Sequence, residues 1–326
     1  MLVQSRLFAV HWIGALALGL LLALPASKAG AQDTVRIAVG VDPVYTPWWI
    51  AEEKGFYKKY GITAQLTQLS GGPDVGDATM AGEADIGSSG SATMMPRIVR
   101  GGLLVLGTMA TSPDALKMAA LTEIKSLDDL KGKKVGTVGA STTDYLWYLL
   151  AKKLNVPEST FNVVSMSPPE LVPSLDRHDI DAYFCWEPWP ARAVEVSGKD
   201  KVHILANSGD LGYLLNFIVV ANQKFALAHP DATSKTLAAL RDAIDFQNKN
   251  PAEAARIGAE KNRLDQKMAA YIINLYQYSL GIAPETESAV KTEEAWMRSM
   301  NRLKGDPIEW SKTIDRGYLD RAMAMK

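Results

Sequence analysis

The sequence is poor in cysteine, in histidine and in net charge. Cys185 is the single cysteine of 326 residues, so no internal disulfide can form. None of the four histidines is spaced with a second ligand as a metal site requires, and neither a Gly-x-Ser-x-Gly elbow nor a glycine-rich phosphate loop with lysine occurs. A formal net charge of −1 argues against nucleic acid as a partner. We therefore expect no metal, no cofactor and a core that is stable without cross-links.

Only the N-terminus contains a long apolar run. Arg6 precedes apolar residues up to about Leu24, and Pro25 and the small residues 29–31 follow, which is the pattern of a signal peptide cleaved after Ala31. The alternative is a retained membrane anchor, because about 18 apolar residues nearly span a bilayer. Two polar or bulky residues interrupt the run, and no cysteine for a lipid anchor lies near the cleavage site.

Cleavage after Ala31 would also change the charge. It removes Arg6 and Lys28, so that the formal net charge moves from −1 to −3. An exported protein without disulfides or a lipid anchor fits the bacterial periplasm, which is the location we expect.

From Val35 onward, β-rich and helical runs alternate, as is typical of βαβ units and a largely parallel sheet. The first series predicts strands at 35–41, 62–69, 84–89 and 103–110, with helices at 46–55, 74–83 and 91–101. A second series predicts strands at 133–138, 161–166, 180–186, 202–206 and 214–225, with helices at 142–154, 168–178 and 188–198. Residues 114–124 are interpreted as a connector and the chain after 225 as helical without a further strand. Two series predict two α/β lobes.

The loops after the predicted strands are the expected ligand-binding region, since ligands of open α/β sheets bind beyond the carboxyl ends of the strands. These loops are rich in aromatic and small hydroxyl residues and contain no lysine or arginine. The predicted ligand contacts are Tyr45, Trp48, Trp49, Ser88, Ser89, Ser91, Thr111, Ser141, Thr142, Thr143, Trp186, Glu187 and Asn216.

Residues 139–143, Gly-Ala-Ser-Thr-Thr, join a predicted strand to a predicted helix. A helix that begins there directs unpaired N–H groups and its positive dipole end at the space above the sheet edge, where a small anion could bind. The alternative is a helix start with Ser141 or Thr142 as its cap. The serines at 88–91 allow the same two interpretations.

The aromatic and acidic candidates also have structural alternatives. Trp48 and Trp49 are adjacent on one predicted helix and cannot both face the same side, so at least one belongs to packing. Trp186 ends a strand and fits either a cleft or the core. Glu187 could bind a ligand amine or favour the start of the next helix. Cys185 is interpreted as a small buried residue.

Four stretches of the chain carry a family resemblance. They are "WWIAEEKGFYKKYGI" (48–62), "AGEADIGSSGSATMMP" (81–96), "SLDDLKGKKVGTVGASTTDYLWYLLAKKLNV" (126–156) and "RHDIDAYFCWEPWPARA" (177–193). Together they resemble the nitrate/sulfonate/taurine-type solute-binding proteins of ABC importers, over essentially the whole chain after the N-terminal region. The parts "KGFYKKYGI" and "SLDDLKGKKVG" are structural in that family and say little about the ligand.

The resemblance implies the type II periplasmic-binding-protein fold, with two α/β lobes, a hinge that the chain crosses twice and one ligand between the lobes. Lobe I would comprise residues 32–112 and 213–326, and lobe II residues 113–212. The implied partners of this monomer are a small organic anion and an ABC transporter permease in the inner membrane. Residues 139–143 would then face residues 88–92, so that two helix starts bind one anionic group.

The same resemblance bears on the ligand. The run Ser141-Thr142-Thr143 resembles the equivalent stretch of taurine-binding members. The sequence departs from those members at Glu187 and in the aromatic loop 45–49, which favours a larger or partly aromatic anion over taurine.

Three functions remain open at this stage. The first is a binding protein for a sulfonate, aromatic or not, or for a related carboxylate or nitrate-like ion. The second is a binding protein for a thiamine-precursor pyrimidine or similar heteroaromatic, which would stack on tryptophan and use the charge of Glu187. The third is an enzyme on the same bilobal fold. Its base would be Asp42, Asp85 or Glu187, and no catalytic set accompanies them.

Overall fold

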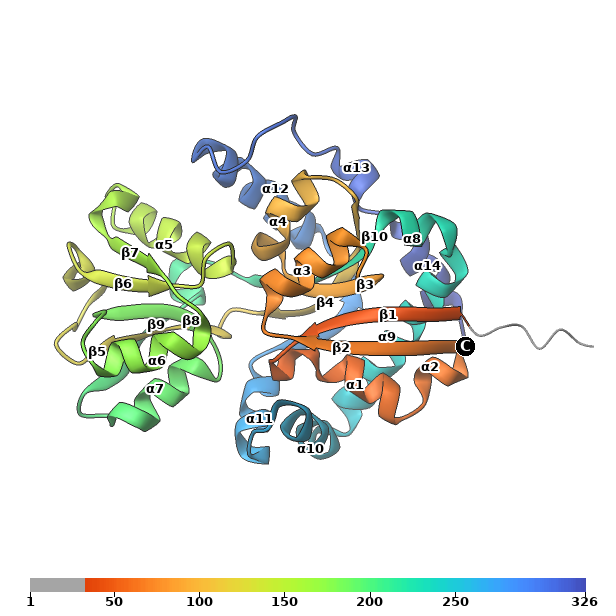
Figure 1. Ribbon diagram of the computed structural model, residues 1–326, viewed down its shortest axis with the longest axis horizontal. Coiled ribbons are helices and arrows are strands. Elements are labelled where there is room, and N and C mark those ends of the chain that lie inside the picture. The colour runs from red at the N-terminus through yellow and green to blue at the C-terminus, as the bar shows by residue number, and fades with distance from the viewer. Residues whose placement is uncertain (1–32) are drawn as a thin grey trace, which may run out of the picture. The chain divides into compact units, whose positions relative to one another are not determined.

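The computed structural model of the protein describes residues 33–326, and these residues form two β-sheets flanked by helices (Figure 1). The signal peptide expected at residues 1–31 lies outside the described residues. Within the described range, no helix is both long and apolar enough to cross a membrane.

The first sheet contains six strands of the described chain, in the order β11-β4-β10-β3-β1-β2. β1 is parallel to β2 and β3, whereas β10 is antiparallel to β3 and β4, and β11 is antiparallel to β4. β10 is buried along nearly its whole length, which agrees with the apolar run of residues 217–221. The strands are β1 (Asp33–Gly40), β2 (Ile62–Leu69), β3 (Ile86–Gly90), β4 (Leu103–Ser112), β10 (Leu215–Asn222) and β11 (Gln277–Gly281).

Most helices of the described chain pack around this first sheet. Trp48 and Ile50 of α1 are fully buried, and α9 packs against α1, α2 and α14. A 3-10 helix at Pro43–Tyr45 precedes α1. The helices are α1 (Thr46–Glu53), α2 (Phe56–Lys59), α3 (Gly72–Ala81), α4 (Ser91–Val99), α8 (Gln223–Ala228), α9 (Pro230–Lys249), α10 (Pro251–Asn262), α11 (Gln266–Asn274), α12 (Pro284–Ser299), α13 (Trp310–Thr313) and α14 (Arg316–Ala324).

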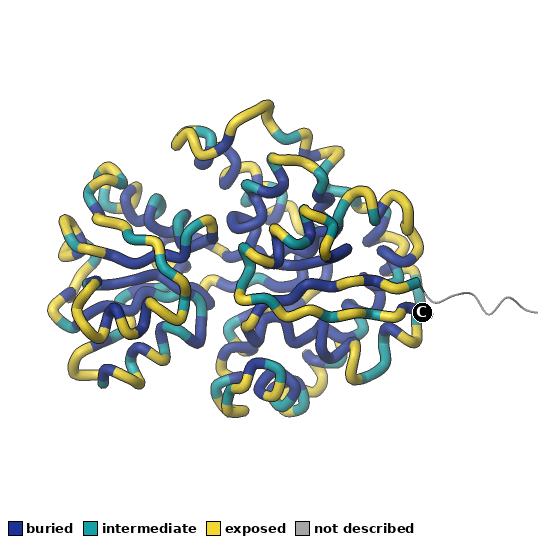
Figure 2. Tube along the Cα trace, in the orientation of Figure 1, coloured by how far each residue is buried: buried dark blue, intermediate teal, exposed yellow. Residues whose placement is uncertain are grey.

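The second sheet contains five strands of the described chain, in the order β7-β6-β8-β5-β9. β6 is parallel to β7 and β8, and β5 is antiparallel to β8 and β9. The elements are β5 (Leu116–Leu121), β6 (Lys134–Thr137), α5 (Thr142–Lys153), β7 (Asn162–Ser165), α6 (Pro168–Asp176), β8 (Ala182–Trp186), α7 (Trp189–Ser197) and β9 (Val202–Asn207), with 3-10 helices at Leu127–Leu130, Glu158–Thr160 and Gly209–Leu211. Figure 2 shows buried residues along the inner strands, whereas the edge strands β2 and β7, the loops and the outer helix faces are largely exposed.

Two short segments connect the sheets. One lies between β4 and β5 and the other between β9 and β10. They contact each other, because Ser208 Oγ and Gly209 N both donate to Pro113 O, at 2.5 and 2.7 Å. We call these segments the first crossing (residues 113–115) and the second crossing (residues 208–214). In the first crossing, Ser112 Oγ also accepts the N–H groups of residues 114 and 115 at 3.0 and 2.9 Å.

Three expectations about the sheets are wrong. Residues 114–124 contain β5, which pairs with two strands, rather than a connector. The chain after residue 225 contains β11, an edge strand of five residues. Its alternation of exposed and buried residues covers too few positions to stand out in a region of long helices. Both sheets are mixed rather than largely parallel, because β5 and β10 enter them antiparallel to their neighbours.

Candidate functional site

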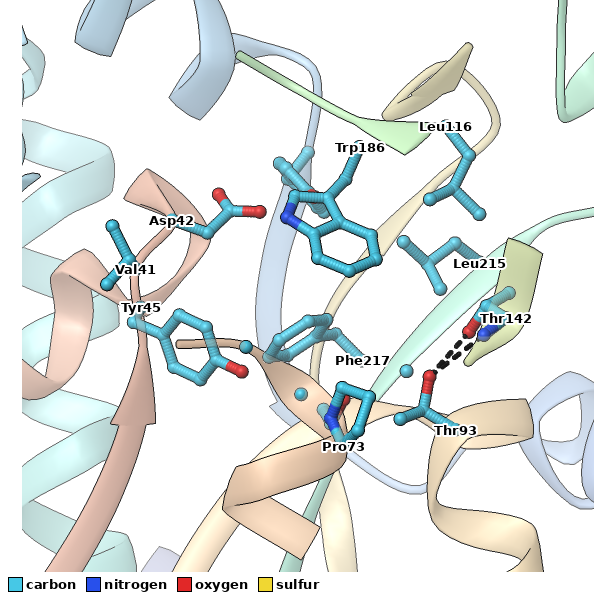
Figure 3. A pocket seen from close by; sticks show the side chains of 15 residues that line it. Val41, Asp42, Tyr45, Pro73, Thr93, Leu116, Thr142, Trp186, Leu215 and Phe217 are labelled. Atoms are coloured by element: carbon cyan, nitrogen blue, oxygen red, sulfur yellow. Dashed lines mark hydrogen bonds between the residues drawn. The ribbon is translucent and has the colours of Figure 1, made fainter. Parts of the chain in front are cut away.

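Residues from both sheets line one cavity with an empty volume of about 450 Å³ (Figure 3). The lining residues are Val41, Asp42, Tyr45, Gly71, Gly72, Pro73, Ser89, Gly90, Thr93, Leu215, Phe217 and Tyr276 with the first sheet, and Leu116, Thr142 and Trp186 with the second.

Three helices begin at the cavity. α3 begins at Gly72, α4 follows Gly90 directly, and α5 begins at Thr142. No side chain caps α3 or α4, whereas Ser141 Oγ accepts the N–H of Thr143 at 3.2 Å and caps α5. The positive dipole ends of these helices favour an anion at this end of the cavity. The N–H groups of Thr142 and Thr143 already donate to the hydroxyls of Thr93 and Ser141, and Pro73 in the first turn of α3 has no N–H.

Two glycines allow the helix starts to come this close together. A Cβ atom on Gly90 would lie 2.6 Å from Thr142 Oγ1 and 3.1 Å from Leu215 Cδ1. A Cβ atom on Gly72 would overlap Ser89 Oγ. Any larger residue at these positions would therefore displace a group that lines the cavity.

Two threonines join the sheets at the same place. The hydroxyls of Thr93 and Thr142 lie 3.0 Å apart, and Thr142 N donates to Thr93 Oγ1 at 3.0 Å. Arg97, one turn further along α4, donates to Thr93 O at 2.8 Å and to Ala140 O at 3.4 Å, while it pairs with Asp77 at 2.8 Å. The loop 139–143 thus packs against the start of α4.

Aromatic rings form another wall of the cavity. Tyr45 and Phe217 make an edge-to-face pair with ring centroids 5.2 Å apart. The Tyr45 hydroxyl donates to Ser88 O at 3.0 Å, and burial together with the charge of Asp42 raises the pKa of Tyr45. Figure 3 shows the Trp186 ring above Phe217 in this view, and Tyr276 completes the aromatic lining.

Asp42 is the acidic residue of the cavity. Its side chain is buried, with a residue exposure of 6%, and Oδ1 accepts the N–H of Val44 at 2.8 Å. Burial raises the pKa of Asp42 to about 7, the hydrogen bond from Val44 opposes this, and the negative charge of Glu187 adds to it. Burial thus favours the uncharged form of this carboxyl group.

Glu187 lies outside the cavity lining and has its own partners. Lys117 Nζ lies 3.1 Å from Glu187 Oε1, with side-chain exposures of only 12% and 2%. Tyr271 of α11 donates to the same oxygen at 3.4 Å, and Ala191 N of α7 donates to Oε2 at 3.1 Å. Glu187 thus acts on the start of α7, which is one of the two roles considered for it.

The structure brings together only part of the predicted site. Tyr45, Ser89, Thr142 and Trp186 line the cavity. The other predicted residues do not line it: Trp48, Trp49, Ser88, Ser91, Thr111, Ser141, Thr143, Glu187 and Asn216.

Three of these other residues have partners outside the cavity lining. Trp48 is fully buried and donates its indole N–H to Ser88 Oγ at 3.0 Å. Trp49 packs under Lys261, whose ammonium lies 4.8 Å from the ring centroid. Ser91 donates to Glu293 at 2.7 Å.

The remaining residues bond within their own elements or to neighbouring ones. Asn216 pairs with Thr111 across β10 and β4 and accepts a hydrogen bond from Thr286 at 3.2 Å. Thr143 Oγ1 lies 2.8 Å from Thr137 Oγ1.

Other cavity residues were not predicted as ligand contacts, above all Asp42, Thr93, Phe217 and Tyr276. Asp42 follows the first strand directly, so its position was a signal that favoured a site role. Phe217 lies within an apolar strand, and nothing in the sequence separates it from the core. Within residues 33–326, no group of three or more histidine, cysteine, aspartate or glutamate residues could hold a metal ion.

The chain is similar in sequence to a known family and to several known proteins. The family described as NMT1/THI5 like matches residues 42–254. A protein of Brucella abortus (strain 2308), which bears only the general name of a binding protein, is 29% identical over 222 residues, which cover 67% of each chain. The taurine-binding periplasmic protein of Escherichia coli (strain K12) is 26% identical over 234 residues, which cover 70% of each chain.

A solved structure shares the fold. The periplasmic aliphatic sulphonate binding protein SsuA from Escherichia coli matches with a TM-score of 0.76 at 17% identity, over 89% of this chain and 99% of that chain. The periplasmic-binding-protein fold that the sequence predicted is therefore confirmed.

Proposed function

Because the chain belongs to the NMT1/THI5-like family, we propose that it is the substrate-binding component of an ABC importer and that its ligand is a small organic anion. The anion is a sulfonate, aromatic or not, or a related carboxylate or nitrate-like ion. The protein works as a periplasmic monomer after cleavage near Ala31, and it delivers the ligand to a permease in the inner membrane. The names of its taurine-binding and sulphonate-binding relatives support this ligand class.

One observation carries the anion proposal. The starts of α3, α4 and α5 converge on a cavity whose nearby hydroxyls are Ser89, Thr93 and Thr142. Backbone N–H groups and hydroxyls at helix starts can bind an anion without a lysine or arginine, and among the described residues neither type lines the cavity. The aromatic wall would contact an apolar or ring-shaped part of the ligand.

We propose in addition that the ligand is released when the two sheets move apart. Lobe I would comprise residues 32–112 and 213–326, and lobe II residues 113–212. The two adjacent crossings at residues 113–115 and 208–214 would act as the hinge. The bond between Thr93 and Thr142 would then belong to the closed form.

A binding screen tests the proposal. Thermal unfolding would be followed with taurine, benzenesulfonate, benzoate, nitrate and an uncharged aminopyrimidine, with chloride at equal ionic strength as the control for general salt effects. A ligand at a hundredfold excess over its dissociation constant should stabilise the protein by about 2.7 kcal/mol. The proposal is wrong if no anion raises the melting temperature above the chloride control.

A second candidate function follows from the other end of the cavity. Asp42 and the rings of Trp186 and Phe217 would suit a neutral or cationic heteroaromatic, such as a thiamine-precursor pyrimidine. In the same screen, stabilisation by the aminopyrimidine without any response to the anions would favour this second function.

We also propose that the protein is not an enzyme. Of the three candidate bases, Asp85 is bound by Arg36, whose backbone N donates at 2.7 Å, and Glu187 is paired with Lys117. Asp42 alone of the three lines the cavity, and no histidine, cysteine or lysine of the described chain accompanies it there. Unchanged recovery of each stabilising ligand after prolonged incubation would agree with binding alone.

A further inference from the structure

Tyr271 on α11 links the first sheet to the second at a place other than Thr93 and Thr142. The Tyr271 hydroxyl accepts a hydrogen bond from Lys117 Nζ on β5 and donates to Glu187 Oε1, directly after β8, at 3.4 Å. Lys117 Nζ lies 4.7 Å from the centroid of the Tyr271 ring. Thr93 and Thr142 belong to α4 and α5, so the two contacts have no helix or strand in common.

Lys117 and Glu187 hold each other without help from α11. Their charged groups lie 3.1 Å apart, and the side chains are 12% and 2% exposed. Glu187 Oε2 also accepts the N–H of Ala191 on α7, and all three residues lie in or next to elements of the second sheet. If α11 and the second sheet move apart, the ion pair remains and only the contacts of Tyr271 are broken.

Tyr271 is not part of the core. It is 41% exposed, whereas the next two residues of α11, Ile272 and Ile273, are buried in the core. An exposed helix position tolerates phenylalanine or leucine with little change in stability. The phenol can therefore be altered while α11 keeps its packing.

The contact is directly connected to the cavity. Leu116 and Trp186 line the cavity, pair with each other across β5 and β8, and immediately precede Lys117 and Glu187. Tyr271 itself does not line the cavity. The movement that brings Leu116 and Trp186 to a ligand therefore also brings the ion pair to Tyr271.

We infer that Tyr271 is a positioning residue that holds the two sheets together around the ligand and thereby sets how long the ligand stays bound. This inference rests on the proposed function, because it assumes that the ligand leaves when the sheets move apart. Tyr271 meets Lys117 and Glu187 only while the sheets are together, and it does not line the cavity that an entering ligand reaches. Loss of its hydroxyl should therefore raise the dissociation rate constant and leave the association rate constant unchanged.

Two substitutions at Tyr271 test the inference. Tyr271→Phe removes the hydroxyl and keeps the ring near Lys117, whereas Tyr271→Leu removes both. The probes are taurine, benzenesulfonate, benzoate and nitrate. Stopped-flow tryptophan fluorescence measures their association and dissociation, since Trp186 lines the cavity, and titration calorimetry measures the dissociation constants.

For each probe that binds, we expect faster dissociation from both variants. The dissociation rate constant should rise about threefold in Tyr271→Phe and about tenfold in Tyr271→Leu, because hydrogen bonds to charged groups and then the cation–π contact are lost. The dissociation constant should rise by the same factors, since association is unchanged.

Tyr60 offers a matched control. Its hydroxyl donates to Asp242 at 2.8 Å, and Lys59 Nζ lies 4.8 Å from its ring centroid and 2.6 Å from Asp242 Oδ2. This phenol, ammonium and carboxylate belong to the end of α2 and to α9, which both pack with the first sheet. Tyr60→Phe should therefore leave both rate constants unchanged.

The outcomes separate this inference from the proposed function. If a probe binds and its dissociation rate constant is unchanged in both Tyr271 variants, the inference is overturned and the binding function stands. Slower association that accounts for the whole loss of affinity also overturns it, as does an equal effect of Tyr60→Phe. Ligand-free Tyr271→Phe should unfold in urea like the unsubstituted protein, and a loss of stability without faster dissociation would assign the phenol to folding alone. If none of the four probes binds, the proposed function and the inference fail together.

Discussion

Adjacent hydroxyls at the start of α5 have different partners and therefore different expected roles. Thr142 Oγ1 lies at the cavity and contacts Thr93, whereas Ser141 Oγ donates to Val138 O at 2.6 Å and accepts the N–H of Thr143. The first side chain can reach a ligand, and the second stabilises the helix.

This difference predicts opposite effects of two small substitutions. Thr142→Val should weaken binding of the anion about tenfold or more, since a hydrogen bond to a charged group contributes roughly 1.5–3 kcal/mol. Ser141→Ala should instead lower the free energy of unfolding by about 1 kcal/mol through loss of the cap. Calorimetric titration and urea unfolding of both variants measure the two effects. A larger loss of affinity in Ser141→Ala would contradict these assignments.

Gly90 predicts a steric effect on closure. Gly90→Ala would place a Cβ atom 2.6 Å from Thr142 Oγ1, so the second sheet should close less completely and the affinity should fall at least tenfold. Gly281→Ala is the control, because no atom lies within 4 Å of a Cβ there. Equal affinities of the two variants would show that Thr142 need not come this close to Gly90 in the ligand complex.

Trp186 is the tryptophan of the described chain that lines the cavity, so its fluorescence should report binding. Stacking contributes about 0.5–1.5 kcal/mol beyond the area that it buries. Trp186→Ala should therefore cost an aromatic sulfonate clearly more affinity than it costs taurine, and it should abolish the change in emission on binding. Equal losses for both ligands would mean that the ring only shapes the cavity.

At the scale of elements, a buried carboxylate joins α12 to two segments near the site. Glu293 of α12 is 1% exposed, and its Oε1 accepts the hydroxyls of Ser91 on α4 and Tyr213 in the second crossing, at 2.7 and 2.9 Å. Its Oε2 has no partner among the described residues. Burial raises the pKa of Glu293 from 4.5 to about 7, although the two hydrogen bonds oppose this shift.

The raised pKa predicts how stability depends on pH. Between about pH 4.5 and pH 7, the folded protein binds more protons at Glu293 than the unfolded chain does, so the free energy of unfolding should fall as the pH rises. The slope from one such group is at most about 1.4 kcal/mol per pH unit. Glu293→Gln should make the dependence shallower, as measured by urea unfolding across this range.

The exposed Glu285 on the same helix gives the control for this measurement. Glu285→Gln should retain the pH dependence of the unsubstituted protein. An unchanged slope in Glu293→Gln would show that this carboxyl group is not protonated in the folded state. Asp42 contributes to the slope in the same direction, because burial raises its pKa as well.

At the scale of the whole molecule, export is the condition on which the proposed transport function depends. The protein recovered from the periplasm should begin at or within a few residues of Gln32, since the small residues 29–31 precede that position. Intact-mass measurement of the periplasmic fraction checks this. A full-length product in the membrane fraction would contradict the signal peptide and favour the retained anchor.

The sequence by itself determined the alternation of strands and helices and where most of them lie. Residues 62–69 were predicted as a strand and form β2 with the same bounds. The helix expected at 142–154 is observed as α5 at Thr142–Lys153. Such elements depend on local periodicity, capping residues and turn residues, which a single sequence contains. The clustering of helix starts after strands was predictable for the same reason.

Tertiary structure alone decided which residues face the cavity and which strands pair. Trp48 and Trp186 both lie close to the end of a predicted strand, and both were predicted as ligand contacts. In the structure, Trp48 is buried and bonds to Ser88, whereas Trp186 lines the cavity. β5 is a strand because β8 and β9 pair with it on both sides, and its own residues do not specify those partners. The acidic residue of the cavity was decided in the same way, since Lys117, distant in sequence, neutralises Glu187 and leaves Asp42 without a cation. Burial, strand pairing and charge neutralisation are contacts between distant segments, so they exist only once the chain has folded.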